Sequence, residues 1–224
     1  RYYSHAKAIL ESVEEADAAV TGSYLAPSGR LTVTAPVLFG QKYITPIIQS
    51  YLAEYDRVSV NAVFLDRVAN LLEDNFDVAV RIGHLADSSL FATHVGDVCR
   101  VVCASPTYLE RRGIPDTPEA LVNHDIIQST AAEPLSSWSF GKRKVKLSPR
   151  VQYNQNAGAI QAALMGGGIT RLMSYQVADE LANGSLVRLL GEFEPPSMPV
   201  SIVYLEGRKA NAKIRAFVDL AVEC

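Results

Sequence analysis

The sequence has no apolar run of the roughly eighteen residues that a membrane-spanning helix needs, so we expect no membrane association. It also has no large excess of either charge, because 21 Lys and Arg residues stand against 24 Asp and Glu, a formal net charge of −3. A domain whose whole surface binds nucleic acid would be basic, and that class is excluded. The first residues lack the apolar core of a secretory signal.

Cysteine is scarce, and the three that occur are Cys99, Cys103 and Cys224. An odd number of cysteines without a signal peptide favours free thiols in a reducing compartment, so we predict a cytoplasmic protein. The four histidines form no cluster with the spacing of metal ligands. We therefore expect no metal and no other cofactor.

Signals of catalysis are also missing. The sequence contains neither a nucleophile elbow nor paired carboxylates on one local segment. The run Gly166-Gly167-Gly168 follows a predicted helix and precedes a predicted strand, which is the reverse of the order in a phosphate-binding loop. These glycines are typical of a helix C-cap and a tight turn, and we expect that the protein is not an enzyme.

A helix is predicted over residues 1–22, where apolar residues recur on average every 3.5 positions. This is the period of a coiled-coil seam and favours a dimerising helix. The alternative is a single helix that packs on its own domain, and fewer than three heptads leave both open. The seam residues are Tyr2, Ala6, Ile9, Val13, Ala16 and Val20.

The rest of the chain follows an α/β pattern. Strands are predicted over residues 30–35, 58–64 and 77–82, with helices over 44–55 and 66–72 between them, which implies a parallel sheet. Pro46 should lie in the first turns of its helix. After a strand at 98–104 the pattern changes. We predict helices at 105–113, 157–165, 175–182 and 211–222, strands at 125–128, 151–153, 169–172, 186–190 and 200–205, and a hairpin at 138–147.

Certain segments stand out along nearly the whole chain: residues 30–36 with Phe39-Gly40, 77–83, 87–90, 102–109 with Gly113, 166–169 and 215–219. In this order they resemble the effector-binding domain of LysR-type transcriptional regulators. Each match alone is modest, but their order is specific. The sequence departs from the family pattern at Tyr55-Asp56 and at Arg171-Leu172-Met173.

The resemblance implies a two-lobed α/β fold of the type 2 periplasmic-binding-protein kind. Each lobe would be a mixed, mostly parallel sheet flanked by helices. Residues 1–22 would be the linker helix, 28–103 with 204–224 the first lobe, and 104–203 the second. DNA would be contacted only through a winged helix-turn-helix preceding residue 1, in a homodimer or homotetramer. A solute receptor of the same fold and, less favoured, an enzyme on it remain alternatives.

Ligands of open α/β sheets bind beyond the carboxyl ends of the strands. In a two-lobed fold this rule predicts cleft residues from both lobes. Those of the first lobe are Pro36, Val37, Leu38, Phe64, Asp66 and Arg81, and those of the second are Gln128, Ser129, Asn154 and Arg171.

Arg81 at the end of a buried strand requires a partner. It either forms a structural salt bridge with Asp66 or Asp97, or it binds an anionic ligand as a fork. With Arg171 on the opposite wall, we expect a small anionic effector rather than a sugar or a cation.

The seam gives a first prediction. If it pairs two chains, changing Ile9→Asp together with Val13→Asp should shift the protein toward monomer, because two buried carboxylates oppose pairing. Light scattering at micromolar concentrations measures this. An oligomer that survives the double change places the interface on the lobes instead.

Overall fold

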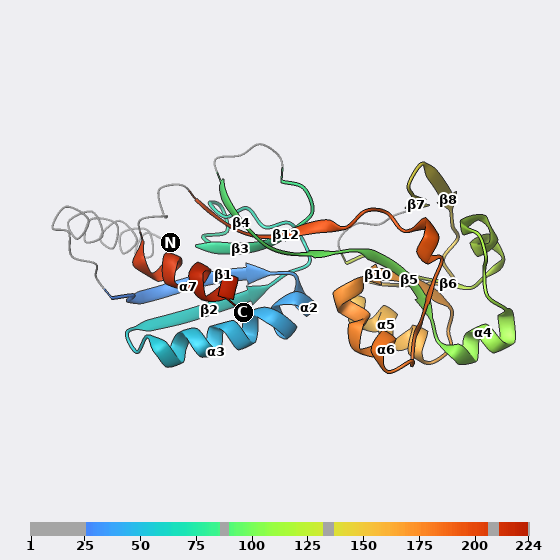
Figure 1. Cartoon of the computed structure of the whole chain (residues 1–224), viewed down its shortest axis with the longest axis horizontal. Helices are drawn as coiled ribbons and strands as arrows, with labels where there is room; N and C mark the ends of the chain where they lie inside the picture. The colour runs from blue at the N-terminus through green and yellow to red at the C-terminus, as the bar shows by residue number, and fades with distance from the viewer. Residues whose placement is uncertain (1–25, 86–89, 132–136, 206–210, 224) are drawn as a thin grey trace.

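The computed structural model describes residues 26–85, 90–131, 137–205 and 211–223. The linker helix predicted over residues 1–22 therefore lies outside the described residues. Figure 1 shows two sheets side by side along the long axis, each with helices packed against it. Within the described residues, no helix is both long enough and apolar enough to cross a membrane.

The first sheet has the strand order β2-β1-β3-β12-β4. β1 pairs in parallel with β2 and β3, whereas β12 pairs antiparallel with β3 and β4. Helices α3 and α7 pack against it, and Tyr51 of α3 and Phe217 of α7 meet edge to face at 5.5 Å. The elements are β1 (Gly29–Ala35), β2 (Val58–Phe64), β3 (Val78–Ile82), β4 (Leu90–Val98), β12 (Met198–Leu205), α3 (Thr45–Glu54) and α7 (Ala212–Glu223).

The predicted helix at 44–55 is the last part of a longer helical segment. It begins with the short α2 (Val37–Phe39), passes through a π-helical turn (Gly40–Ile44) and continues as α3. Pro46 lies in the first turn of α3, as predicted. Gly40 is required where Phe64 packs against it, because a Cβ there would lie 2.4 Å from the Phe64 ring.

The second sheet has the strand order β11-β5-β10-β6-β9. β6 pairs in parallel with β9 and β10, whereas β5 pairs antiparallel with β10 and β11. A separate two-stranded hairpin, β7–β8, matches the predicted one. The elements are β5 (Arg100–Ala104), β6 (Ile126–Ser129), β7 (Ser137–Phe140), β8 (Arg143–Lys146), β9 (Val151–Tyr153), β10 (Ile169–Met173), β11 (Val187–Leu189), α4 (Pro106–Arg112), α5 (Asn156–Leu164) and α6 (Ala178–Ala182); 3-10 turns span Pro118–Asn123, Ser174–Val177 and Gly191–Phe193.

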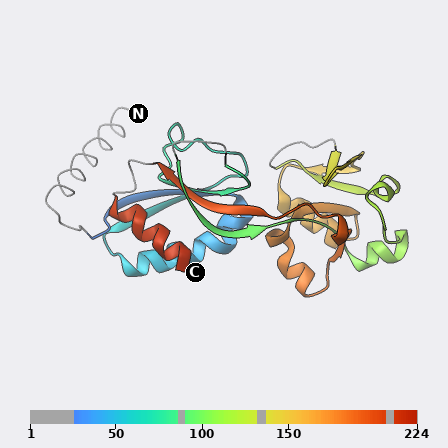
Figure 2. The ribbon, with the colours of Figure 1, turned by 45° about the horizontal axis from the view of Figure 1, so that its top comes forward.

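The chain passes between the sheets twice. It leaves the first sheet at Cys99, between β4 and β5, and returns through residues 194–197 ahead of β12. Figure 2 shows the two connecting stretches running side by side. The predicted lobe boundaries fall inside β5 and β12, and the division of the chain into lobes stays a prediction.

Two local predictions need correction. Residues 66–72 do not form a helix: the Asp66 carboxylate accepts the Val37 N–H at 3.1 Å, and Asp74 organises the following turn by binding Arg67 and the Asn70 N–H. The sequence reading also missed β4. This edge strand is buried only at Val98, so its residues show little of the apolar alternation that predicts a strand.

The glycine run ends helix α5, as predicted. The Gly166 and Gly167 amides donate to the Ala163 and Ala162 carbonyls, and Gly166 has a φ of 75°. Gly168 has a φ of 152°, and a Cβ there would lie 2.3 Å from the Asp125 carbonyl oxygen. The run thus lets β10 start directly beside β6.

This geometry yields a stability prediction. Gly168→Ala should lower the free energy of unfolding by about 1–3 kcal/mol, the usual cost of backbone strain of this kind. Gly191→Ala is the matched control, because no atom lies within 4 Å of its added Cβ. Urea denaturation of both variants measures the difference. Equal stability of the two variants would contradict the strain argument.

Candidate functional site

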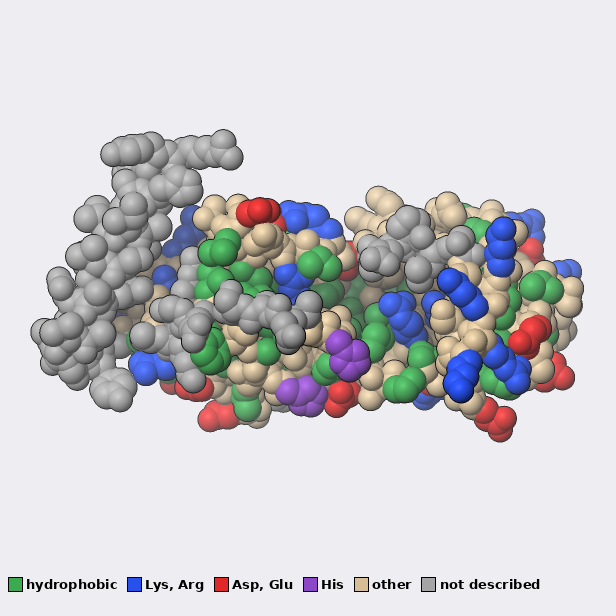
Figure 3. Space-filling model, turned by 90° about the horizontal axis from the view of Figure 1, so that it is seen from above, with side chains coloured by type: hydrophobic (Ala, Val, Ile, Leu, Met, Phe, Trp, Pro, Cys, Tyr) green, Lys and Arg blue, Asp and Glu red, His purple; other side chains and the backbone are tan. Residues whose placement is uncertain are grey.

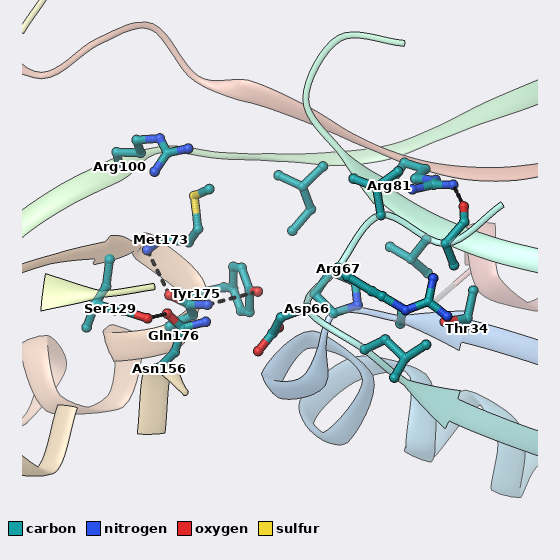
Figure 4. A pocket seen from close by; sticks show the side chains of 18 of the residues that line it. Thr34, Asp66, Arg67, Arg81, Arg100, Ser129, Asn156, Met173, Tyr175 and Gln176 are labelled. Carbon is teal, nitrogen blue, oxygen red and sulfur yellow. Dashed lines mark hydrogen bonds between the residues drawn. The ribbon is translucent and has the colours of Figure 1, made fainter. Parts of the chain in front are cut away.

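A cavity of about 370 Å³ lies where the two sheets face each other (Figure 4). The first sheet contributes the carboxyl ends of β1 and β3, Pro36 after β1 and residues 65–69 after β2. The second contributes the start of β5, the end of β6, β7, the start of α5, β10 and the 3-10 turn after it. The lining residues include Thr34, Pro36, Asp66, Arg67, Arg81, Arg100, Gln128, Ser129, Trp138, Asn156, Arg171, Met173, Tyr175 and Gln176.

The structure brings six of the ten predicted site residues together around this cavity. All but Arg171, which lies in the middle of β10, reach the cavity from the carboxyl end of a parallel strand or from the residues that follow it. Whether they bind a ligand stays a prediction. The six are Pro36, Asp66, Arg81, Gln128, Ser129 and Arg171.

The other four predicted residues are not among those that line the cavity. Val37 donates its backbone N–H to Asp66, and Phe64 packs in the first core. Leu38 packs against the cores of both sheets. Asn154 is exposed, and Asn156 two residues later lines the cavity in its place.

Sequence reasoning missed several lining residues. Arg100 begins its strand instead of ending it, so the strand-end rule does not find it. Trp138 belongs to the hairpin outside the five-stranded sheet. Tyr175 and Gln176 lie in the 3-10 turn, where the sequence predicted a regular helix.

Arg171 is a partly buried cation whose described partners carry no charge. Its Nη1 donates to the Ser139 carbonyl at 3.1 Å, and its guanidinium lies 5.1 Å from the Trp138 ring centroid and 5.8 Å from that of Phe140. Burial, and to a lesser degree the positive charge of Arg100, lowers the pKa of Arg171 to about 10. The second-sheet wall therefore concentrates positive charge.

Arg81 lines the opposite side of the cavity and donates to the Ala69 carbonyl oxygen (Figure 4). Burial lowers the pKa of its guanidinium. The salt bridge with Asp66 or Asp97 is absent from the described residues. Asp66 accepts the Val37 N–H, and Asp97 lies 3.3 Å from His94 Nε2.

Polar groups on the second-sheet side are held in place by one another. Ser129 Oγ donates to Asn156 Oδ1 at 2.7 Å, and Trp138 Nε1 donates to Gln128 Oε1 at 3.3 Å. Gln176 Oε1 accepts the Met173 N–H at 3.0 Å. Such fixed partners reduce the ordering needed when a ligand binds.

Tyr175 lies in the cavity wall near Asp66 (Figure 4). Its hydroxyl accepts a hydrogen bond from Gln176 Nε2 at 3.2 Å. Burial, with a smaller contribution from the Asp66 carboxylate, raises the pKa of Tyr175 to about 12, so its hydroxyl stays protonated at neutral pH. Among the described residues, no group of three or more His, Cys, Asp or Glu side chains could hold a metal ion.

Comparison with known proteins decides the family. The model of the LysR substrate binding domain matches residues 26–223. The chain belongs to this family. It is the ligand-binding domain of a LysR-type transcriptional regulator, as the sequence resemblance predicted.

Its relatives are bacterial regulators of the helix-turn-helix type. The chain is 28% identical to CrgA of Neisseria meningitidis serogroup B over 227 residues, covering all of this chain and 76% of CrgA. It is 28% identical over 217 residues to a regulator of Haemophilus influenzae, covering 95% of this chain and 75% of the relative.

Solved structures confirm the fold class. The CrgA regulatory domain from Neisseria meningitidis superposes with a TM-score of 0.76 at 29% identity, covering 88% of this chain and 98% of that one. The AphB regulatory domain of Vibrio vulnificus shares the fold, with a TM-score of 0.74 at 23% identity over 89% of this chain and all of that one. The LysR domain thus has the type 2 periplasmic-binding-protein fold, with two mixed sheets flanked by helices.

Proposed function

We propose that this domain senses a small anionic effector in the cavity between the two sheets and thereby controls DNA binding by the full-length regulator. The observation that carries the proposal is Arg171, a partly buried cation in the cavity wall with only neutral described partners. Burying a charge without an opposite charge is costly, and an anionic ligand removes that cost.

The surroundings of Arg171 favour an organic anion with a flat apolar part. Arg100 adds positive potential on the same wall, and the indole of Trp138 lies beneath the guanidinium. A cavity of about 370 Å³ holds a molecule the size of a small aromatic acid. Asp66 across the cavity disfavours a second anionic group on its own side.

Arg81 contributes positive potential from the first-sheet wall. Its guanidinium has only the Ala69 carbonyl among its described partners, so donors remain for a ligand. A ligand that contacts Arg81 and Arg171 would connect the two sheets. Its differential affinity for two arrangements of the lobes is the free energy available for regulation.

The remaining parts of the proposal follow from the relatives. They are named as transcriptional regulators of the helix-turn-helix type, which favours a cytoplasmic, DNA-directed, non-enzymatic role. DNA would be bound through a head domain, and the regulator would act as a homodimer or homotetramer. The protein itself would need no cofactor.

The test uses three compounds of nearly equal shape: benzoate, benzyl alcohol and benzylamine. Benzoate should raise the melting temperature, and the neutral and cationic compounds should not, because only the anion compensates the buried guanidinium. A parallel screen of aliphatic acids, alcohols and amines covers ligands without a ring. Trp138 is the single tryptophan, so its fluorescence reports occupancy of the cavity directly.

Two variants test whether Arg171 and Arg81 bind the anion. Arg171→Gln and Arg81→Ala should each weaken binding of the stabilising acid by roughly ten- to a hundredfold, the usual effect of losing a charge-assisted hydrogen bond. Arg143→Gln, which removes an exposed hairpin charge paired with Glu119, is the matched control and should change little.

Stabilisation by neutral or cationic compounds alone would overturn the anion proposal. If Arg81→Ala unfolds the domain, Arg81 acts as an anchor of the loop at Ala69 and not as a ligand contact. Unchanged affinity in Arg171→Gln would remove that residue from the site.

A further inference from the structure

A second cavity, of about 640 Å³, adjoins the first. Its walls come from the helical segment after β1, from β4 and β12, and from the start of α6. Tyr175 and Val80 line both cavities. The proposed effector role does not use the second cavity.

Two irregular backbone features border this cavity. The π-helical turn Gly40–Ile44 contributes Lys42, Tyr43 and Ile44 to its walls. In β4 the pairing with β12 shifts register, since Val200 pairs with Gly96 and Ser201 with His94, so Val95 is an extra residue that also lines the cavity. π-turns and β-bulges are frequent at functional sites, where they redirect side chains.

The cavity is predominantly apolar and aromatic. Phe39, Tyr43 and Tyr175 form a ring cluster on one wall, with centroids 4.8, 5.2 and 6.3 Å apart. Branched aliphatic residues such as Ile47, Val98 and Ile202 line the rest. An open hollow with these apolar and aromatic walls has the size and lining of a small-molecule site.

The charged groups at this cavity are either paired or solvated. Lys42 Nζ lies 2.8 Å from the Asp179 carboxylate, and the Asp97 carboxylate is half exposed to solvent and lies 3.3 Å from His94 Nε2. The wall therefore offers no uncompensated charge comparable to Arg171. The polar side-chain groups left include the hydroxyls of Tyr43, Ser50 and Ser174, and Ser174 Oγ also accepts the Cys99 N–H at 3.2 Å.

From these observations we infer that the cavity is a second ligand site, which takes a neutral aromatic molecule separately from the anion in the first cavity. Stacking against Phe39, Tyr43 and Tyr175 would hold the ring, and a serine hydroxyl would bind one polar substituent. The inference does not depend on the effector proposal, because the two cavities differ in charge and in most of their walls.

The experiment uses N-phenyl-1-naphthylamine, a neutral aromatic probe whose fluorescence increases in apolar surroundings. The whole chain should bind it saturably with one site per chain. Ala178→Phe fills the cavity from the start of α6, and Ser50→Trp fills it from the exposed side of α3. Each should weaken probe binding at least tenfold.

Two controls separate the site from other surfaces. Ala182→Phe places the same ring one turn further along α6 at an exposed position, and it should leave the affinity unchanged. Ser129→Phe fills the first cavity instead and should also leave the probe bound. Circular dichroism and thermal melting establish that each variant is folded, and Ser50→Trp decides the question if Ala178→Phe does not fold.

Absence of saturable binding to the unmodified chain overturns the inference. So does equal affinity in the folded cavity-filling variants and in Ala182→Phe. Loss of the probe in Ser129→Phe alone would place it in the first cavity, and it would contradict the second site while leaving the anion proposal intact.

Discussion

The packing of Tyr175 into the core of the first sheet joins the two sheets at the cavity between them. Tyr175 follows β10 of the second sheet, yet it is buried among first-sheet residues and meets Phe39 edge to face at 5.2 Å. Lys42 and Asp179 join the same two segments by an ion pair, and Leu38 contacts the cores of both sheets. These contacts join the two sheets in addition to the two connecting stretches, so the shape of the space between the sheets depends on them.

The positive charge at the proposed effector site comes from Arg171, whose described partners are all neutral. An arginine that faces a carboxylate is satisfied without a ligand, whereas Arg171 faces a carbonyl oxygen and two aromatic rings. Cation–π contacts stabilise a guanidinium by only about 0.5–2 kcal/mol, less than an opposite charge provides in a partly buried place. Figure 3 shows further Lys and Arg side chains gathered on the surface of the second-sheet half. The wall is thus positive before any ligand arrives, and an anion approaching it is attracted over several ångströms.

The sequence predicted most strands because their apolar alternation reflects burial. Five of the six predicted cavity residues were found because parallel strands end at the same edge, whereas Arg171 lies in the middle of its strand. Prediction from the sequence failed for elements and side chains whose position depends on tertiary packing. β4 is a partly exposed edge strand with little alternation, and the predicted helix over residues 66–72 does not form, since Asp66 binds the Val37 N–H. Trp138 reaches the cavity only because the hairpin folds over β6, where its indole donates to Gln128. No local pattern in the sequence contains that contact.

Tyr175 links the two cavities, because its side chain lines both of them. The Tyr175 hydroxyl accepts a hydrogen bond from Gln176 Nε2, and Gln176 Oε1 in turn accepts the Met173 N–H. A ligand that moves the ring changes the shape of the neighbouring cavity and the contact with Phe39 together. Linkage then requires that a ligand in one cavity alters affinity in the other by the same factor in both directions. Because the contact between Phe39 and Tyr175 also joins the two sheets, the same movement would alter the packing between them.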